Sequence, residues 1–228
     1  PKGLVGSEMC IRDRIHIIDL NKTISKLDEA CRSLNQIAKS GKKILFVATK
    51  KQAKTIVAES AKSLNMPYIT ERWPGGLLTN FSTIRKSIKK MNSIDTMKED
   101  GTFDTLSKRE KLQIERTREK LELNFGSIEN MNRIPEAIFV VDINKEHIAI
   151  AEANKLGMRS YAMVDTNTNP KLVDFPIPAN DDSTKSISKI MQIISEAIAE
   201  GLSERSKTIE ENAKIKQEKA KEILNKDN

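Results

Sequence analysis

Three lysines follow a short apolar segment at a place where phosphate could bind. The segment KILFVAT (43–49) is rich in strand formers, and Lys50, Lys51 and Lys54 follow it at the expected start of a helix. Lysines at a helix N-terminus oppose the helix dipole unless an anion binds there. We therefore predict that these lysines contact phosphate. A simple exposed basic turn is the alternative.

The same loop argues against a nucleotide-using enzyme, because it contains no glycine and neither phosphate-binding glycine motif. Asp142 and Asp165 follow later predicted strands, as acidic residues do in hydrolase and phosphoacceptor sites. No catalytic partners accompany them, and His147 is isolated. Helix N-capping and turn stabilisation are their more ordinary roles. We expect no catalytic residue, no cofactor and no enzymatic activity.

Metal-ligating residues are sparse. The two histidines, His16 and His147, have no second ligand at a useful spacing, and Cys10 and Cys31 form no ligand pattern. Two such cysteines are typical of reduced thiols in a cytosolic protein. We predict no metal site.

The charge distribution points to a polyanionic partner. The chain has 39 Lys and Arg against 32 Asp and Glu, a net charge of +7. Residues 39–90 alone hold twelve basic residues and two glutamates, so this block carries +10 and the remainder −3. Nucleic acid is the first candidate partner. A solvated basic surface is the alternative.

Apolar periodicity predicts an α/β fold. Short apolar strands at 43–49, 67–73, 137–142 and 160–165 alternate with amphipathic helices at 20–38, 51–64, 145–156 and 183–199. A fifth strand at 174–178 contains two prolines and is expected at an edge of the sheet. This alternation is typical of a doubly wound parallel sheet.

The alternation is interrupted between residues 77 and 131. Apolar residues from Leu77 to Ile94 recur with nearly heptad spacing, and they return from Ile114 to Ile128 after a polar connection. This pattern predicts an inserted antiparallel helical hairpin, or coiled coil, that projects from the sheet. Its candidate RNA-binding residues lie off the apolar seam: Arg85, Lys86, Lys89, Lys90, Arg109, Arg116 and Arg118. A solvated coiled-coil exterior is the alternative.

Trp73 is the only tryptophan, and it precedes the turn Pro74-Gly75-Gly76. It could stack on an RNA base, with Arg72 beside it as a further RNA contact. We favour the alternative that Trp73 covers the edge of the sheet core. The charged tail 201–228 has few apolar positions, which predicts a frayed helix or disorder. No segment has the roughly 20 apolar residues of a membrane span.

Three stretches together resemble the bacterial-type small-subunit ribosomal protein number two family. They are RWPGGLLTNFSTI (72–84), PEAIFVVD (135–142) with the helix through Gly157-Met158, and VDTN (164–167) with Pro170, FPIPANDD (175–182) and Ser186-Ile187. The resemblance covers about residues 15–201. It implies a flavodoxin-like sheet with a hairpin insertion. It also implies a cytoplasmic, non-enzymatic constituent of the small ribosomal subunit that is monomeric within the ribosome.

The resemblance further implies contacts with small-subunit rRNA through both domains, and help in docking the large mRNA-binding protein number one. Family members usually carry His-Phe-Gly-His and Trp-Asn-Pro segments before the stretch seen here at 15–20. Residues 5–14 instead look like translated sequencing adapter, so we interpret 1–14 as non-native. The expected organisation is a sheet domain (15–76 and 132–200), the hairpin (77–131) and the tail (201–228). The alternatives are a phosphate- or nucleotide-using α/β enzyme and a coiled-coil adaptor that binds protein.

Overall fold

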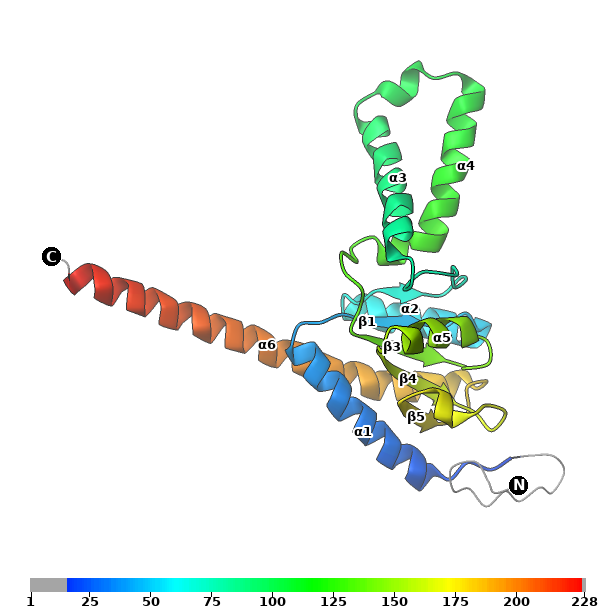
Figure 1. Cartoon of the computed structure of the whole chain (residues 1–228), viewed down its shortest axis with the longest axis vertical. Helices are drawn as coiled ribbons and strands as arrows, with labels where there is room; N and C mark the ends of the chain where they lie inside the picture. The colour runs from blue at the N-terminus through cyan, green and yellow to red at the C-terminus, as the bar shows by residue number, and fades with distance from the viewer. Residues whose placement is uncertain (1–15, 227–228) are drawn as a thin grey trace.

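The fold is built on one parallel sheet (Figure 1). The computed structural model describes residues 16–226, without the side chains of Asp104 and of residues 212–226, so the segment interpreted as non-native, 1–14, lies outside the described residues. The strands are β1 (Ile44–Val47), β2 (Tyr68–Ile69), β3 (Ala137–Val141), β4 (Arg159–Val164) and β5 (Phe175–Pro178). Their spatial order is β2-β1-β3-β4-β5, all parallel, which is the flavodoxin-like order. This confirms the predicted fold class.

Helices cover both faces of the sheet. One face packs against α1 (Leu20–Lys39), α2 (Lys51–Ser63) and the first half of α6 (Thr184–Lys226). The other face packs against α5 (His147–Lys155), the segment around Trp73 and the base of the hairpin. Strands β1 and β3 are buried at every position because they are covered on both sides. The continuous apolar runs in their sequences reflect this burial.

The hairpin is inserted between β2 and β3 and projects away from the sheet (Figure 1). It consists of α3 (Phe81–Glu99) and α4 (Lys108–Phe125), joined through a short 3-10 turn at Thr102–Thr105. Helix α3 buries Ile84, Ile88, Met91 and Ile94, the seam seen in the sequence. Helix α4 begins at a capping box, in which the side chains of Ser107 and Glu110 each accept a bond from the other's backbone N–H.

Two elements differ from the sequence prediction. Strand β2 spans only two residues instead of 67–73, because the chain leaves the sheet after Thr70. Trp73 then packs into the hydrophobic core on the face of the sheet that α5 covers. Helix α6 does not end at residue 199 but continues to Lys226, beyond the sheet (Figure 1). After Gly201 the sequence holds neither proline nor glycine and is rich in Glu and Lys, which favour helix even without a core to pack on.

Gly201 lies where α6 crosses α1, and it allows the two helices to approach closely. A Cβ atom at this position would lie 2.6 Å from the Asn35 carbonyl oxygen and 3.0 Å from the Ala38 Cβ. At an exposed helical site, Gly→Ala stabilises by about 1 kcal/mol. Here we expect Gly201→Ala to destabilise by about 1–3 kcal/mol because the helices must separate. Urea unfolding measures this, with Gly75→Ala, which meets no atom within 4 Å, as the control.

Candidate RNA interface and the carboxyl edge of the sheet

The loop after β2 is organised by one carboxylate from α5, Glu152. Its Oε1 accepts bonds from the Trp73 indole N–H (3.1 Å) and the Gly76 backbone N–H (2.7 Å). Its Oε2 accepts bonds from the backbone N–H groups of Leu78 (3.0 Å) and Thr79 (3.2 Å) and from the Thr79 hydroxyl (3.2 Å). Glu152 is buried, so this one side chain satisfies donors that would otherwise be cut off from water.

These bonds change both the acidity of Glu152 and the role of Trp73. Desolvation raises the pKa of Glu152, but the bonds from Trp73 and from the three backbone N–H groups outweigh it, and the pKa lies below its ordinary value. Trp73 is only 7% exposed and packs with the core beneath α5. The favoured alternative for Trp73, a cover for the sheet core, is therefore what the structure shows.

Lys50 does not extend into solvent from the start of α2. Its Nζ atom lies 2.6 Å from Asp181 Oδ1, 2.7 Å from Asp182 Oδ1 and 3.5 Å from Asp142 Oδ2. We call Lys50, Asp142, Asp181 and Asp182 the carboxyl-edge cluster, because they gather where the strands end. Lys50 and Asp181 are buried, whereas Asp182 is exposed. The Lys50 ammonium is thus engaged by three carboxylates of this chain.

Charges in the carboxyl-edge cluster depend on one another. Desolvation lowers the pKa of Lys50, but hydrogen bonds to Asp181 and Asp182 and the nearby negative charges raise it well above its ordinary value. Desolvation raises the pKa of Asp181, the Lys50 bond opposes that rise, and the charge of Asp142 adds to it. The Asp181 Oδ2 atom is buried without a hydrogen-bond partner. Lys50 therefore offsets part of the negative charge that gathers at this acid-rich site.

Three carboxylates at this edge are close enough to hold a cation. Oxygen atoms of Asp165, Asp181 and Asp182 lie within 4.8 Å of one another. No histidine or cysteine spacing in the sequence indicates this group, and Asp165 lies on a different loop from the two other aspartates. Lys50 already binds two of the three carboxylates, so it would compete with a cation for them.

Asp142 and Asp165 have the ordinary roles that the sequence favoured. Asp142 Oδ1 accepts from the backbone N–H groups of Asn144 (3.0 Å) and Lys145 (3.3 Å), and Asp165 Oδ1 accepts from Thr166 N (2.6 Å). Nearby, the buried Glu146 accepts the backbone N–H and hydroxyl of Thr49. Desolvation raises the pKa of Glu146 despite these bonds. Asp142 and Asp165 thus stabilise the turns after β3 and β4, and Glu146 links the segment after β1 to the start of α5.

The structure divides the predicted RNA-binding residues into two groups. The first group is held by contacts within the chain: Lys54 binds Glu71 at 2.9 Å, Arg85 binds the Met131 carbonyl and Asn132, and Arg118 binds Asp95 and Glu122. Lys50 and Trp73 also belong to it. The second group is exposed and, among the described residues, has no ion pair: Lys51, Arg72, Lys86, Lys89, Lys90, Arg109 and Arg116.

Most of the second group lies on the hairpin. Lys86, Lys89 and Lys90 lie on α3, while Arg109 and Arg116 lie on α4. Lys51 lies at the start of α2, and Arg72 lies in the loop after β2. Cations without intramolecular partners can bind phosphate without first breaking an ion pair. This group is therefore better suited to RNA backbone contact than the first.

In the part of the chain that the structure describes, none of the helices is both long and apolar enough to cross a membrane.

Comparison with known proteins agrees with the fold and the motifs. The family described as Ribosomal protein S2 matches residues 9–201. The chain is 64% identical over 194 residues to the small ribosomal subunit protein uS2 of Flavobacterium johnsoniae, covering 85% of this chain and 76% of that protein. It is 63% identical over 194 residues to the protein of the same name from Phocaeicola vulgatus, covering 85% and 70%. The chain belongs to the ribosomal protein S2 family.

Proposed function

We propose that this chain binds small-subunit rRNA through its hairpin and its sheet domain, and that it helps to dock the mRNA-binding protein number one. As a member of the ribosomal protein S2 family, it is a structural protein of the small ribosomal subunit and not an enzyme. Family membership excludes the enzyme alternative raised by the sequence. The docking of protein number one is supported by the family resemblance.

The observation that carries the RNA-binding proposal is the set of unpaired cations on the hairpin. Lys86, Lys89 and Lys90 are exposed on α3, whose apolar face packs at Ile84, Ile88 and Met91. The apolar side chains occupy one side of α3, so these lysines lie on its remaining, exposed surface. A projecting helix pair with free cations can follow an RNA backbone, because phosphate contacts depend on charge rather than on sequence.

Replacing Lys86, Lys89 and Lys90 together with glutamine is expected to weaken binding to small-subunit rRNA and to flatten its salt dependence. Each lost phosphate contact removes close to one unit from the slope of log K against log salt. Filter binding at several KCl concentrations measures this slope. The matched control replaces Lys185, Lys189 and Lys207, exposed lysines of α6 that have no ion pair among the described residues, with glutamine. An unchanged slope in the hairpin variant would contradict the proposal for α3.

The lysines after β1 are considered separately, because Lys50 and Lys51 differ in exposure and in ion pairing. Lys51 is exposed at the start of α2, whereas Lys50 is engaged by aspartates. The contact expected at the α2 N-terminus therefore depends on Lys51, and on Lys54 if it releases Glu71.

For docking, sucrose-gradient fractions of small subunits assembled without this chain are expected to contain less protein number one. Retention at the normal level would contradict this part of the proposal.

A further inference from the structure

A groove runs along the amino ends of β1, β2 and β3, at the edge of the sheet opposite the carboxyl-edge cluster. Two cavities of about 430 and 170 Å³ form it, and both are lined by Lys43, Asn130 and Met131. One wall is the turn at 41–43 before β1, and the other is the segment 130–136, which connects the hairpin to β3. We call this surface the amino-edge groove.

The amino-edge groove carries a net positive charge. Lys42, Lys43 and Arg133 line it against one carboxylate, that of Glu136. Glu136 binds Lys42 at 2.8 Å, which leaves Lys43 and Arg133 without an ion pair among the described residues. Lys43 Nζ donates to the Asn65 carbonyl oxygen (2.6 Å), a neutral acceptor that leaves the charge of the ammonium uncompensated. Lys43 and Arg133 are both exposed, so an anion can reach them.

Arg205 of α6 adds a further cation beside the groove. Its guanidinium lies over Gly41, in the space that a Cβ atom at this position would fill, and Gly41 lines the groove. Arg205 is exposed and has no ion pair with any described residue. The neighbouring Glu204 is already bound by Lys39 at 2.5 Å. Cations from the turn before β1, from the segment before β3 and from α6 thus converge at one edge of the sheet.

The groove is continuous with the hairpin surface that carries the proposed RNA contacts. Arg85, near the start of α3, donates to the Met131 carbonyl oxygen (3.2 Å) and to Asn132 Oδ1 (2.6 Å), and both residues line the groove. Lys89 lies four residues after Arg85, one turn further along the same side of α3. An RNA strand that follows the α3 lysines toward the sheet therefore reaches the amino-edge groove next.

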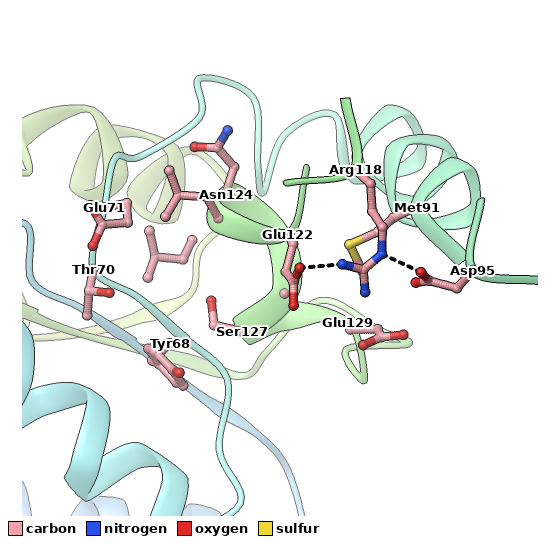
Figure 2. A pocket seen from close by; sticks show the side chains of 13 residues that line it. Tyr68, Thr70, Glu71, Met91, Asp95, Arg118, Glu122, Asn124, Ser127 and Glu129 are labelled. Carbon is pink, nitrogen blue, oxygen red and sulfur yellow. Dashed lines mark hydrogen bonds and ion pairs between the residues drawn. The ribbon is translucent and has the colours of Figure 1, made fainter. Parts of the chain in front are cut away.

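A second cleft, between α4 and β2, is unsuited to phosphate. Four carboxylates line it with one cation, Arg118, and Figure 2 shows that Arg118 binds Asp95 and Glu122. A third carboxylate of the lining, Glu71, is bound by Lys54. This cleft therefore offers a phosphate no unpaired cation and an excess of negative charge. Of these two hollows at the root of the hairpin, the amino-edge groove is the one that fits an RNA backbone.

We propose that the amino-edge groove binds the sugar–phosphate backbone of small-subunit rRNA, as a contact separate from the α3 lysines. Lys43 and Arg133 bind phosphate oxygens, and Arg205 binds a phosphate on the side of Gly41. Ile134, 45% exposed in the lining, offers an apolar contact to a ribose. The inference rests on the proposed RNA binding and extends it to a surface of the sheet domain.

Replacing Lys43, Arg133 and Arg205 with glutamine in the full chain is expected to weaken binding to small-subunit rRNA. The slope of log K against log salt is expected to fall by about two to three units, because each lost phosphate contact removes close to one. Filter binding at several KCl concentrations measures the slope. The matched control, Lys185, Lys189 and Lys207 to glutamine, removes the same charge from α6 outside the groove and is expected to leave the slope nearly unchanged.

Acetylation of lysines in the parent chain, read by mass spectrometry, locates the contact without any variant. Bound rRNA is expected to slow acetylation of Lys43 several-fold and to leave that of Lys185 unchanged. Equal slopes for the groove variant and its control, or an unprotected Lys43, would overturn the inference, while a lower slope in the α3 lysine variant would still support the proposed function.

Two further outcomes are distinct from these. A parent chain whose rRNA binding does not depend on salt would contradict the proposed function and this inference together. An oligoglutamate peptide that protects Lys43 from acetylation, where rRNA does not, would overturn the inference alone, because the groove would then bind an acidic protein segment.

Discussion

Replacing Glu152 with glutamine is expected to lower the free energy of unfolding by about 2–4 kcal/mol, although the side chain keeps its size. The carboxylate accepts bonds with both oxygens: two donors face Oε1 and three face Oε2. A glutamine NH₂ group must face one of these sets, so buried donors meet a donor. Urea unfolding at pH 7 measures the loss, and the emission of Trp73, the only tryptophan, follows the loop directly.

The pH dependence gives this prediction a second measurement. The pKa of Glu152 is lower in the folded protein than its ordinary value, so the folded state favours the carboxylate. Its contribution to stability is present above the unfolded pKa, about 4.3, and is lost as pH falls through the folded pKa. The stability difference between the parent chain and Glu152→Gln is therefore expected to shrink below about pH 4.

Glu119→Gln is the control for Glu152, because Glu119 is exposed on α4. Its effect is expected within about 0.5 kcal/mol of the parent. If Glu152→Gln unfolded at the same urea concentration as this control, the hydrogen bonds around Glu152 would not be organising the loop. A Trp73 emission spectrum unchanged from the parent would lead to the same conclusion.

The sheet could be predicted from the sequence because its signals are local. Strands β1 and β3 are continuous apolar runs, and such runs arise when helices cover both faces. The prolines of β5 predicted an edge position, and β5 lies at the edge beside β4. Strand β2 was predicted too long, because aromatic and β-branched residues after Ile69 resemble a strand until the bond between Trp73 and Glu152 is known.

The acidic networks could not be predicted from local patterns. Glu152 binds residues more than 70 positions earlier, and Lys50 binds Asp181, 131 positions later. In sequence, Glu152 is one acidic residue on an amphipathic helix, and Lys50 is one of three lysines in a turn. Only the folded sheet, which aligns the ends of separate strands, brings them to their partners. The motif RWPGGLLTN was visible in the sequence, but the carboxylate that organises it was not.

Replacing Lys50 with methionine is expected to lower the free energy of unfolding by about 3–5 kcal/mol, because a buried charge then has no partner. Asp181 is 2% exposed, and its Oδ1 would lose the ammonium 2.6 Å away. Lys51→Met is the matched control: Lys51 is the next residue, exposed and without an ion pair. Its effect is expected within about 0.5 kcal/mol of the parent. Thermal and urea unfolding of the two variants separate these outcomes.

Acid is expected to reduce the deficit of Lys50→Met. Desolvation already raises the pKa of Asp181, and removing Lys50 takes away the bond that opposes this rise. A folded pKa above the unfolded value, about 3.9, means that the folded state gains stability by binding a proton as pH falls through the folded pKa. The double variant Lys50→Met with Asp181→Asn, which removes the unpaired charge, is expected to recover part of the loss at pH 7. A deficit that is the same at every pH, with no recovery in the double variant, would mean that Lys50 stabilises the fold by packing and not by balancing Asp181.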